Sequence, residues 1–526
     1  MPRGVEASQS STDTANEHTV CMIGAGYVGA LTAIALATKN PRRQFCVVDK
    51  DKSLIDSWES ECPPIFEPGL EDLLFPDGLD TAALSGKNDL GQNPAFDPRL
   101  NIQPSRRKNR LSNISFSAEV CKHVKEAGTI FICVDTPLDV TTLTSDNNNG
   151  LDLKNLKAVV ETIAHVSVGH KIIVQKSTGP CGVVQWIRET LRETASSLAS
   201  FDVLSSPEFL AQGTAIQDLL YPNRIVLGHI NDPDTTPAAL ATIRQLYTPW
   251  VPGDRIITTD TWSSELAKIA SNAFIAQRIS SINSLSAVCE AANADVSDLS
   301  RIVGLDPRIG PLCLRAGFGF GGSCLHKDLC CLVYLARELG LHDVAAYWRG
   351  VIQINESQVE RIACRIEGAI SPFIRDEGTR VAILGFSFKK NTADIRNTTA
   401  LGLVRELVRR GLQVSVYDAH VMTERIKKAL NLQYGSDLSE LRRVNVVNSV
   451  KAACWRCCVV VLHTDWDEFS SENVGWRDIV NQMDQPRAFL GPGGTFDQQA
   501  MQSFGFRVLT VGKADSLDSP VSTVIL

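Results

Sequence analysis

The feature that most constrains this fold is the glycine fingerprint Gly-Ala-Gly-Tyr-Val-Gly at 24–29, which follows an apolar strand pattern and opens a helical one. In this context Gly24 permits a tight turn, Gly26 lets backbone N–H groups approach a pyrophosphate, and Gly29 lets helix and strand pack closely. Asp49 ends the next apolar strand, where a carboxylate bonds a ribose diol and repels a 2′-phosphate. The pattern predicts an α/β domain that binds NAD in preference to NADP.

Apolar β-branched runs alternate with helical patterns in two parts of the chain. The first part has strand patterns at 19–23, 45–49, 129–134, 171–175, 202–205 and 224–228. The second has strand patterns at 381–384, 413–417 and 459–463 and a helical pattern at 398–410. Between them, helical periodicity runs from 262 to about 292 without Pro or Gly, which predicts one long helix. We therefore expect an α/β protein with two Rossmann-like parallel-sheet domains joined by a central helical domain.

These patterns divide the chain into four predicted parts. They are a polar tail at 1–17, an N-terminal NAD-binding domain at 18–259, a central helical domain at 260–372 and a C-terminal domain at 373–526. Within the N-terminal domain, residues 75–110 are rich in Gly, Pro, Asn and Asp and are expected to form an inserted surface loop.

Composition limits the classes of function. The 526 residues carry a formal net charge of -7, which gives no long-range attraction to nucleic acid or an anionic membrane. No run approaches the roughly 18 apolar residues of a membrane span, and the 15 cysteines are an odd number scattered through apolar runs. We therefore expect a cytoplasmic protein with no nucleic-acid or membrane partner. We expect no metal site, because no Cys/His spacing matches a zinc centre.

A second glycine-rich run, at 317–324, ends in Cys324 and is followed by Lys327 and Asp328. Its glycines leave little side-chain bulk, so a substrate and a nicotinamide ring can both approach the thiol. A thiol near a cation and a helix N-terminus ionises readily and adds as a thiolate to an aldehyde; loss of hydride then gives a thioester. The alternative, a buried structural thiol, is the usual outcome for a cysteine in a protein core.

Other polar residues fall where a ligand site would need them. Lys268 and Asn272 are four residues apart on the predicted long helix, so an ammonium and an amide share a face and can converge on an oxyanion. The segments 134–137, 176–178 and 207–210 each follow a predicted strand, at the edge where open α/β sheets bind ligands.

Together these residues resemble the UDP-glucose/GDP-mannose dehydrogenase family, and within it most closely the eukaryotic UDP-glucose 6-dehydrogenases. The likeness runs from about Thr19 to about Asp467. The matching segments are GAGYVG at 24–29, FEPGL at 66–70, VDTP at 134–137, KST at 176–178, PEFL at 207–210, TWSSELAKIASNAFIAQRISSIN at 261–283, RIG at 308–310, FGGSC at 320–324, KD at 327–328 and GFSFKK at 385–390.

The resemblance implies a central domain that dimerises through the long helix and a C-terminal domain that binds a UDP-sugar, so we expect a homodimer or higher homo-oligomer. It implies NAD-dependent, four-electron oxidation of UDP-glucose to UDP-glucuronate. The reaction would pass through a thiohemiacetal and a thioester on the cysteine and would consume two NAD per substrate.

The resemblance also assigns roles to single residues. Cys324 is the expected nucleophile, Lys268 and Asn272 stabilise oxyanions, Asp328 assists proton transfer or activates water, Glu208 acts in thioester hydrolysis and Thr178 positions a water. The expected cofactor contacts are Gly24, Gly26, Tyr27, Val28, Gly29, Asp49, Val134, Thr136, Pro137, Ser177, Thr178, Lys327 and Arg396. The expected substrate contacts are Glu208, Phe209, Leu210, Lys268, Asn272, Phe320, Gly321, Cys324, Phe388 and Lys389, with Arg308 reaching the substrate of a neighbouring subunit.

One segment departs from the family pattern. After Phe489 the family reads Asp-Gly-Arg-Arg, with an arginine that contacts substrate, whereas residues 490–495 here read Leu-Gly-Pro-Gly-Gly-Thr. Losing such an arginine weakens substrate binding by about 1.5–3 kcal/mol if no other residue replaces it. The altered segment therefore leaves open the same chemistry on another UDP-hexose, a UDP-N-acetylhexosamine or GDP-mannose. Two further alternatives stay open on other grounds. A protein of this fold can be a catalytically weak paralogue with a binding or regulatory role, or a simpler alcohol or hydroxyacid dehydrogenase that transfers one hydride.

Overall fold

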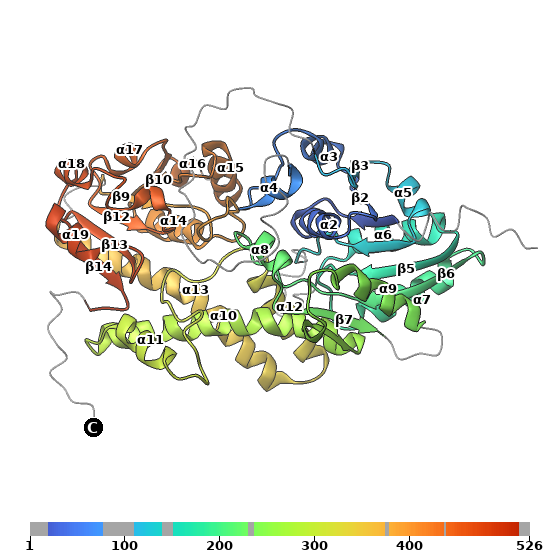
Figure 1. Ribbon diagram of the computed structural model, residues 1–526. Coiled ribbons are helices and arrows are strands. Elements are labelled where there is room, and N and C mark those ends of the chain that lie inside the picture. The colour runs from blue at the N-terminus through green and yellow to red at the C-terminus, as the bar shows by residue number, and fades with distance from the viewer. Residues whose placement is uncertain are drawn as a thin grey trace, which may run out of the picture. The chain divides into compact units, whose positions relative to one another are not determined.

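The computed structural model describes residues 19–76, 110–138, 151–229, 236–373, 378–435 and 438–514. It forms two compact units, drawn in Figure 1, one of residues up to 136 with 152–266 and one of residues 137–151 with 267–526. The predicted tail at 1–17 and residues 77–109 of the predicted inserted loop lie outside the described residues. The division into four predicted parts stays a prediction. Across the described helices, none is both long enough and apolar enough to cross a membrane.

The first unit contains an eight-stranded sheet, in the order β3-β2-β1-β4-β5-β6-β7-β8. The strands are β1 (Thr19–Ile23), β2 (Gln44–Val48), β3 (Ile114–Ser117), β4 (Thr129–Ile132), β5 (Gly169–Gln175), β6 (Ala199–Ser205), β7 (Ile225–His229) and β8 (Ile256–Thr259). Neighbouring strands run parallel except β6 and β7, which pair antiparallel. The predicted parallel sheet is confirmed, and the short strands β3 and β8 are added at its two edges.

Both faces of this sheet are covered, because alternate residues of each strand point to opposite faces. In β1, Val20 and Met22 pack into one apolar cluster and Cys21 and Ile23 into another. The first cluster includes α2 (Tyr27–Lys39), α3 (Lys52–Glu59), α4 (Leu70–Leu74), α8 (Ala215–Leu220) and α9 (Pro237–Tyr247), and the second α5 (Val120–Glu126), α6 (Lys154–Val166) and α7 (Val183–Thr194). A strand buried on both faces explains the continuous apolar runs in the sequence.

The second unit contains a six-stranded parallel sheet in the order β11-β10-β9-β12-β13-β14. Its strands are β9 (Arg380–Leu384), β10 (Gln413–Tyr417), β11 (Val444–Val446), β12 (Val459–Leu462), β13 (Ala488–Pro492) and β14 (Arg507–Val511). The helices packed on it include α14 (Thr399–Arg409), α15 (Thr423–Tyr434), α17 (Val450–Cys454), α18 (Trp476–Asn481) and α19 (Gln498–Phe504). This confirms the second predicted parallel sheet and adds β11, β13 and β14 to it.

The central helices are α10 (Thr261–Ala291), α11 (Val296–Gly304), α12 (Leu325–Glu338) and α13 (His342–Ile370). The 31 residues of α10 confirm the predicted long helix. Its first turns, up to Leu266, belong to the first unit and the remainder to the second. A second long helix, α13, has 29 residues and packs against α12 and α14.

The two sheets share one order of strands, in which the first strand lies between the second and the fourth. In an open α/β sheet this is the point where the strand order reverses, and ligands bind there beyond the carboxyl ends of the strands. In the first sheet this point lies between β1 and β4, and in the second it lies between β9 and β12. The residues that follow these strands are therefore placed to contact a ligand. Both predicted ligand loops, at 24–29 and 385–390, begin there.

Candidate active site

Two of the three fingerprint glycines, Gly24 and Gly29, are required by their surroundings. Gly24 has φ +110, and a Cβ there would lie 2.6 Å from the carbonyl oxygen of Cys133. A Cβ on Gly29 would lie 2.0 Å from the carbonyl oxygen of Gly24. A Cβ on Gly26, by contrast, would meet nothing within 4 Å. The space above Gly26, together with a helix α2 that starts at Tyr27 without a side-chain cap, fits the pyrophosphate of NAD.

Asp49 is joined to this glycine loop. Its Oδ2 accepts a hydrogen bond from the N–H of Ala25 at 2.9 Å, and its Oδ1 accepts one from Asp51 N–H at 3.0 Å. The sequence placed Asp49 at a strand end but gave no reason to expect its contact with the fingerprint. The carboxylate therefore lies beside the loop that is expected to receive the cofactor, where it can select against a 2′-phosphate.

This position predicts the cofactor preference. Because bringing like charges together costs several kcal/mol, we expect kcat/KM with NADP to be at least about 100-fold below that with NAD, where each factor of ten is about 1.4 kcal/mol. Asp49→Ser is expected to narrow this ratio at least about ten-fold. Initial rates with both cofactors measure it, and Asp56→Ser, which changes an exposed carboxylate of α3, is the control. Equal use of NADP by the unaltered protein would contradict the assignment.

Three strand-end segments are tied together at the same edge of the first sheet. The Thr136 hydroxyl donates to the carbonyl of Thr178 at 2.6 Å, and the Ser177 hydroxyl donates to the carbonyl of Ile132 at 3.2 Å. The ammonium of Lys176 donates to the carbonyl of Ser206 at 3.3 Å. The segments at 134–137, 176–178 and 207–210, singled out in the sequence, thus begin from neighbouring strands.

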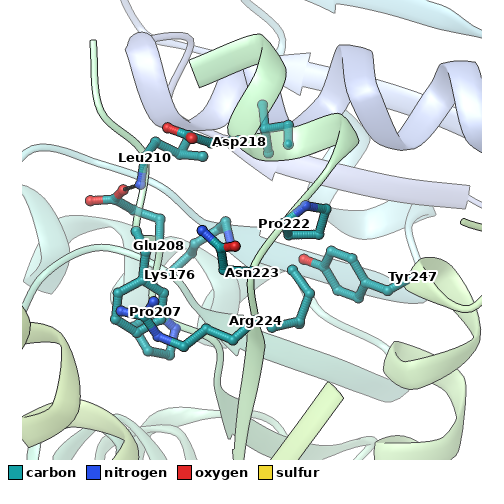
Figure 2. Close-up of a pocket in the computed structure, with 12 residues that line it drawn as sticks. Lys176, Pro207, Glu208, Leu210, Asp218, Pro222, Asn223, Arg224 and Tyr247 are labelled. Carbon is teal, nitrogen blue, oxygen red and sulfur yellow. Dashed lines mark hydrogen bonds between the residues drawn. The ribbon is translucent and has the colours of Figure 1, made fainter. Parts of the chain in front are cut away.

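Glu208 lines a small pocket in the first unit, shown in Figure 2. The pocket has a volume of about 60 Å³ and is lined by Lys176, Pro207, Glu208, Phe209, Leu210, Asp218, Leu219, Pro222, Asn223, Arg224, Ile225 and Tyr247. The Glu208 carboxylate accepts a hydrogen bond from Leu210 N–H at 2.7 Å. The Arg224 guanidinium stacks over the Phe209 ring, 3.9 Å from its centroid. A pocket of this size admits a few water molecules.

Glu67 joins the fingerprint to the loop that follows Glu208. Its buried carboxylate accepts hydrogen bonds from the Tyr27 hydroxyl, from Gly213 N–H at 2.8 Å and from Ala215 N–H at 2.6 Å. The segment FEPGL was recognised in the sequence, but no role for its glutamate was predicted. A carboxylate that binds partners so distant along the chain leaves no periodic signal.

In the second unit, Cys324 is exposed and lies directly before α12, as its N-cap residue. The N-terminus of a helix favours negative charge. One turn into the helix, Asp328 is fully buried, and its Oδ2 accepts a hydrogen bond from the Asn272 amide at 2.6 Å. Lys268, also buried, lies one helical turn before Asn272 on α10. The structure therefore brings Asn272 and Asp328 into contact, as their predicted shared site requires.

The glycine run packs against the loop after β9. A Cβ on Gly321 would lie 2.6 Å from the Asn397 carbonyl oxygen and 2.9 Å from Phe388 Cβ. Gly322 N–H donates to the carbonyl of Arg396 at 3.0 Å. This contact groups several expected ligand residues, namely Phe320, Gly321, Phe388, Lys389 and Arg396, around the run that carries Cys324.

Two expected arginines are turned towards nearby aspartates. Arg396 makes a bidentate pair with Asp394, and Arg308 makes one with Asp306. The Arg308 side chain is 86% exposed. The remaining expected contacts lie on three elements. Val28 is on α2, Val134 and Pro137 follow β4, and Lys327 is on α12.

The segment that departs from the family pattern is closely packed. Pro492 ends β13, and its Cγ is 3.5 Å from the position a Cβ on Gly317 would take. A Cβ on Gly493 would lie 2.5 Å from Ser297 Oγ. Gly493 is thus required by its contact with α11, and Pro492 lies beside the glycine run.

His463 follows β12 and lies beside the same run, with its ring centroid 5.0 Å from that of Phe318. The Thr464 hydroxyl donates to the Ser387 carbonyl at 2.7 Å, so it accepts from His463 Nδ1, 3.1 Å away. His463 Nε2 then accepts from the Thr399 hydroxyl at 2.8 Å. Burial lowers the pKa of His463 to about 4, against a nearby Asp418 that raises it. The ring is therefore neutral at physiological pH.

This lowered pKa predicts a loss of stability in mild acid. In the unfolded chain a histidine has a pKa of about 6.5 and binds a proton at a pH where the folded His463 stays neutral. The free energy of unfolding is therefore highest above pH 6.5 and falls as the pH drops towards 4. Between pH 7 and pH 5 the loss is about 2 kcal/mol. Urea unfolding of the second unit at the two pH values measures it. His463→Gln is expected to show a smaller difference, and an unchanged pH dependence in that variant would contradict the assignment.

All 15 cysteines are free thiols. Within the described ranges, no group of three or more His, Cys, Asp or Glu side chains is placed to hold a metal ion.

Three family models of the UDP-glucose/GDP-mannose dehydrogenase family match the chain. The NAD binding domain matches residues 18–98 and 91–251, the central domain 262–357 and the UDP binding domain 382–492. The UDP-glucose 6-dehydrogenase of Drosophila melanogaster is 39% identical over 498 residues, covering 94% of this chain and 96% of the relative. That of Caenorhabditis elegans is also 39% identical, covering 94% and 95%.

The fold matches solved structures over nearly the whole chain. A UDP-glucose dehydrogenase from Pyrobaculum islandicum aligns with a TM-score of 0.71 at 24% identity, covering 98% of this chain and 97% of that one. A UDP-D-ManNAc dehydrogenase from Pyrococcus horikoshii aligns with a TM-score of 0.71 at 22% identity, covering 94% and 100%.

Proposed function

Because this chain belongs to the UDP-glucose/GDP-mannose dehydrogenase family, we propose that it oxidises the C6 alcohol of UDP-glucose to the carboxylate of UDP-glucuronate. The overall reaction consumes one water and two NAD per UDP-glucose and yields two NADH and protons. The Drosophila relative, named for this activity and 39% identical, supports the choice of substrate. The observation that carries the chemistry is the exposed thiol of Cys324, one helical turn before the buried Asp328, whose carboxylate accepts a hydrogen bond from Asn272.

The residues of the second unit have distinct tasks in this proposal. When bound, NAD supplies the acceptor for the hydride that leaves C6 in each oxidation. Cys324 Sγ adds to the aldehyde formed in the first oxidation and gives a thiohemiacetal, which becomes a thioester when C6 loses its second hydride. Lys268 and Asn272 donate hydrogen bonds to the oxygen that becomes negative. Asp328 is proposed to assist proton transfer from the substrate oxygen or to activate the attacking water, and Asn272 holds its carboxylate in place.

Hydrolysis of the thioester requires a positioned water. Water adds to the thioester carbon, the C–S bond breaks, and the thiol of Cys324 leaves as the carboxylic acid forms. Glu208 lines a pocket that admits a few water molecules, which supports its proposed role as the base for that water. Thr178, tied to Thr136, is proposed to position the water.

The proposed homo-oligomer uses the central helices. Large apolar side chains are exposed on α10 and α13 of the second unit: Phe274, Ile275, Val344, Tyr347 and Ile354. A second copy covering this face would bury them, and Arg308, exposed near the start of the glycine run in sequence, is proposed to reach the substrate of that copy. Sedimentation gives the oligomeric mass. We further propose a reducing compartment such as the cytosol, which the free thiols support.

The test of this function is the amount of NADH formed per mole of UDP-glucose consumed, with UDP-N-acetylglucosamine and GDP-mannose run in parallel. Two NADH per UDP-glucose is the expected result. One NADH would support the single-hydride alternative instead.

Another nucleotide sugar is the second candidate, favoured by the missing arginine at 490–495. A kcat/KM that is higher for any other sugar than for UDP-glucose would establish that candidate. No NADH from any of the sugars would favour the catalytically weak paralogue.

A further inference from the structure

We infer that three buried amide side chains, those of Asn283, Asn355 and Gln358, position the glycine run that carries Cys324 and thereby set the reactivity of its thiol. We call these three residues the amide clamp. The inference rests on the proposed function in one respect only, the effect expected on turnover.

The glycine run needs ordering from outside. Residues 317–324 belong to no helix or strand, and glycine has more backbone freedom than any other residue. A nucleophile must nevertheless be held close to one productive geometry, because a misplacement of about 1 Å costs on the order of 100-fold in rate. Neither the glycines nor a neighbouring strand supplies that order here.

Asn355, on α13, binds both backbone groups of one residue of the run. Its Oδ1 accepts from Phe320 N–H at 2.7 Å, and its Nδ2 donates to the Phe320 carbonyl at 3.0 Å. This is the pairing that a neighbouring strand would provide. A Cβ on Gly319 would lie 2.6 Å from the same Oδ1, so the glycine leaves the room that the amide fills.

Gln358 and Asn283 together bind both backbone groups of Gly317. Gln358, one turn further along α13, donates from Nε2 to the Gly317 carbonyl at 2.6 Å. Asn283, on α10, accepts at Oδ1 from Gly317 N–H at 2.9 Å. Both side chains are buried. Two residues of the run, Gly317 and Phe320, thus have all four backbone polar groups bound by amide side chains of two helices.

The orientation of the Asn283 amide leaves one of its polar groups without a hydrogen bond. Because Gly317 N–H requires an acceptor, the Asn283 amide can present only its oxygen there. Its Nδ2 is then buried and has no hydrogen-bond partner in the part of the chain that the structure describes. An unpaired buried donor destabilises a fold, and such groups are typical of sites where geometry is retained for function.

Amides suit this place for a chemical reason. One amide offers a donor and an acceptor and carries no charge. A carboxylate or an ammonium would bind only one of the two backbone groups and would add a charge beside the run. The amide clamp therefore fixes the run without changing the charge around Cys324.

The first test replaces the clamp while leaving the thiol in place. In Asn355→Leu, with similar volume and neither hydrogen bond, we expect kcat to fall at least about ten-fold while KM for UDP-glucose and NAD stays within about three-fold. The rate of Cys324 alkylation by iodoacetamide, followed by peptide mass spectrometry, is expected to fall at least about three-fold, because the loosened run no longer holds the exposed sulfur at the N-terminus of α12, where negative charge is favoured. Gln358→Leu, tested in the same way, covers the case in which the first variant fails to fold.

Two controls separate positioning from general loss of stability. Gln353→Leu removes an exposed amide from the same helix. Asn113→Leu removes a buried amide that donates to the carbonyls of Ala37, Asn40 and Arg43 in the first unit. Neither control is expected to change Cys324 alkylation. The inference is overturned if alkylation in both clamp variants stays within about two-fold of the unaltered protein, or if Asn113→Leu reproduces the effect.

The alkylation experiment needs no substrate, so it is independent of the proposed function. If the protein turns over no nucleotide sugar but Cys324 is alkylated more slowly in the clamp variants, the proposed function fails and the clamp stands. If turnover is as proposed and alkylation and kcat of the variants are unchanged, the clamp fails and the function stands.

Discussion

Cys324→Ser is expected to abolish release of the carboxylic acid, with kcat for the complete oxidation falling at least about 1,000-fold. A serine hydroxyl is far less ionised than a thiol at neutral pH and forms an ester in place of a reactive thioester, so both the second oxidation and the hydrolysis suffer. Chromatography of the nucleotide products, together with NADH absorbance, measures the effect. We expect the reaction to stop with the aldehyde, or its hemiacetal, still bound to the protein.

The matched control for this substitution is Cys121→Ser, which changes another exposed thiol. It is expected to leave the yield of acid unchanged. Full turnover with two NADH per sugar in Cys324→Ser would remove the covalent mechanism, and unchanged release of a single NADH would establish the simpler dehydrogenase.

The second large effect is expected at the pair formed by Asn272 and Asp328. Removing one donor to a developing oxyanion costs about 100–1,000-fold in kcat, so Asn272→Ala is expected to lose activity in that range. Asp328→Ala is expected to do likewise, because the two side chains share a hydrogen bond of 2.6 Å. The double variant is expected to be little worse than the poorer single one, since contacting residues that act as a unit are not additive.

Steady-state kinetics of the three variants complete this cycle, and Ser284→Ala is the control. The Ser284 hydroxyl, on the same helix, donates to the carbonyl of Ser281. Losses that multiply in the double variant would mean that Asn272 and Asp328 act separately, and a loss below about three-fold in either single variant would exclude that residue from the chemistry.

Sequence reasoning succeeded where the constraint was local. The roles of Gly24 and Gly29 follow from the tight approach of a helix to a strand, which the neighbouring residues already encode. The long helix α10 was predictable because its periodicity is unbroken over many turns. The two sheets were predictable in type because buried strands read as apolar runs.

It failed for short edge strands and for polar contacts between distant residues. The strand β11 has three residues, of which Asn445 is exposed, so it carries no apolar run. The contact of Asn355 with Phe320 joins residues 35 apart in the chain, and the contact of Asn272 with Asp328 joins residues 56 apart. An amide on a helix looks like any surface residue until the packing is known. Family resemblance assigned roles to Asn272 and Asp328, but only the structure supplied either contact.

In both sheets, the loop that follows the first strand is anchored by the same two hydrogen bonds. Gly24 N–H donates to the Val48 carbonyl at 2.8 Å and Gly385 N–H donates to the Tyr417 carbonyl at 2.8 Å. The next amide in each case donates to the aspartate that follows the second strand, Asp49 or Asp418.

What differs is the length of chain before the next helix. In the first sheet residues 24–26 suffice, so α2 presents bare backbone amides, whereas in the second sheet residues 385–398 intervene and present Phe388, Lys389 and Arg396 instead. The two loops therefore offer different groups to a ligand, while the strand order and the bonds that anchor the loops are shared. Grafting a shorter loop after β9 is a route to a protein with two dinucleotide sites, without altering a single strand.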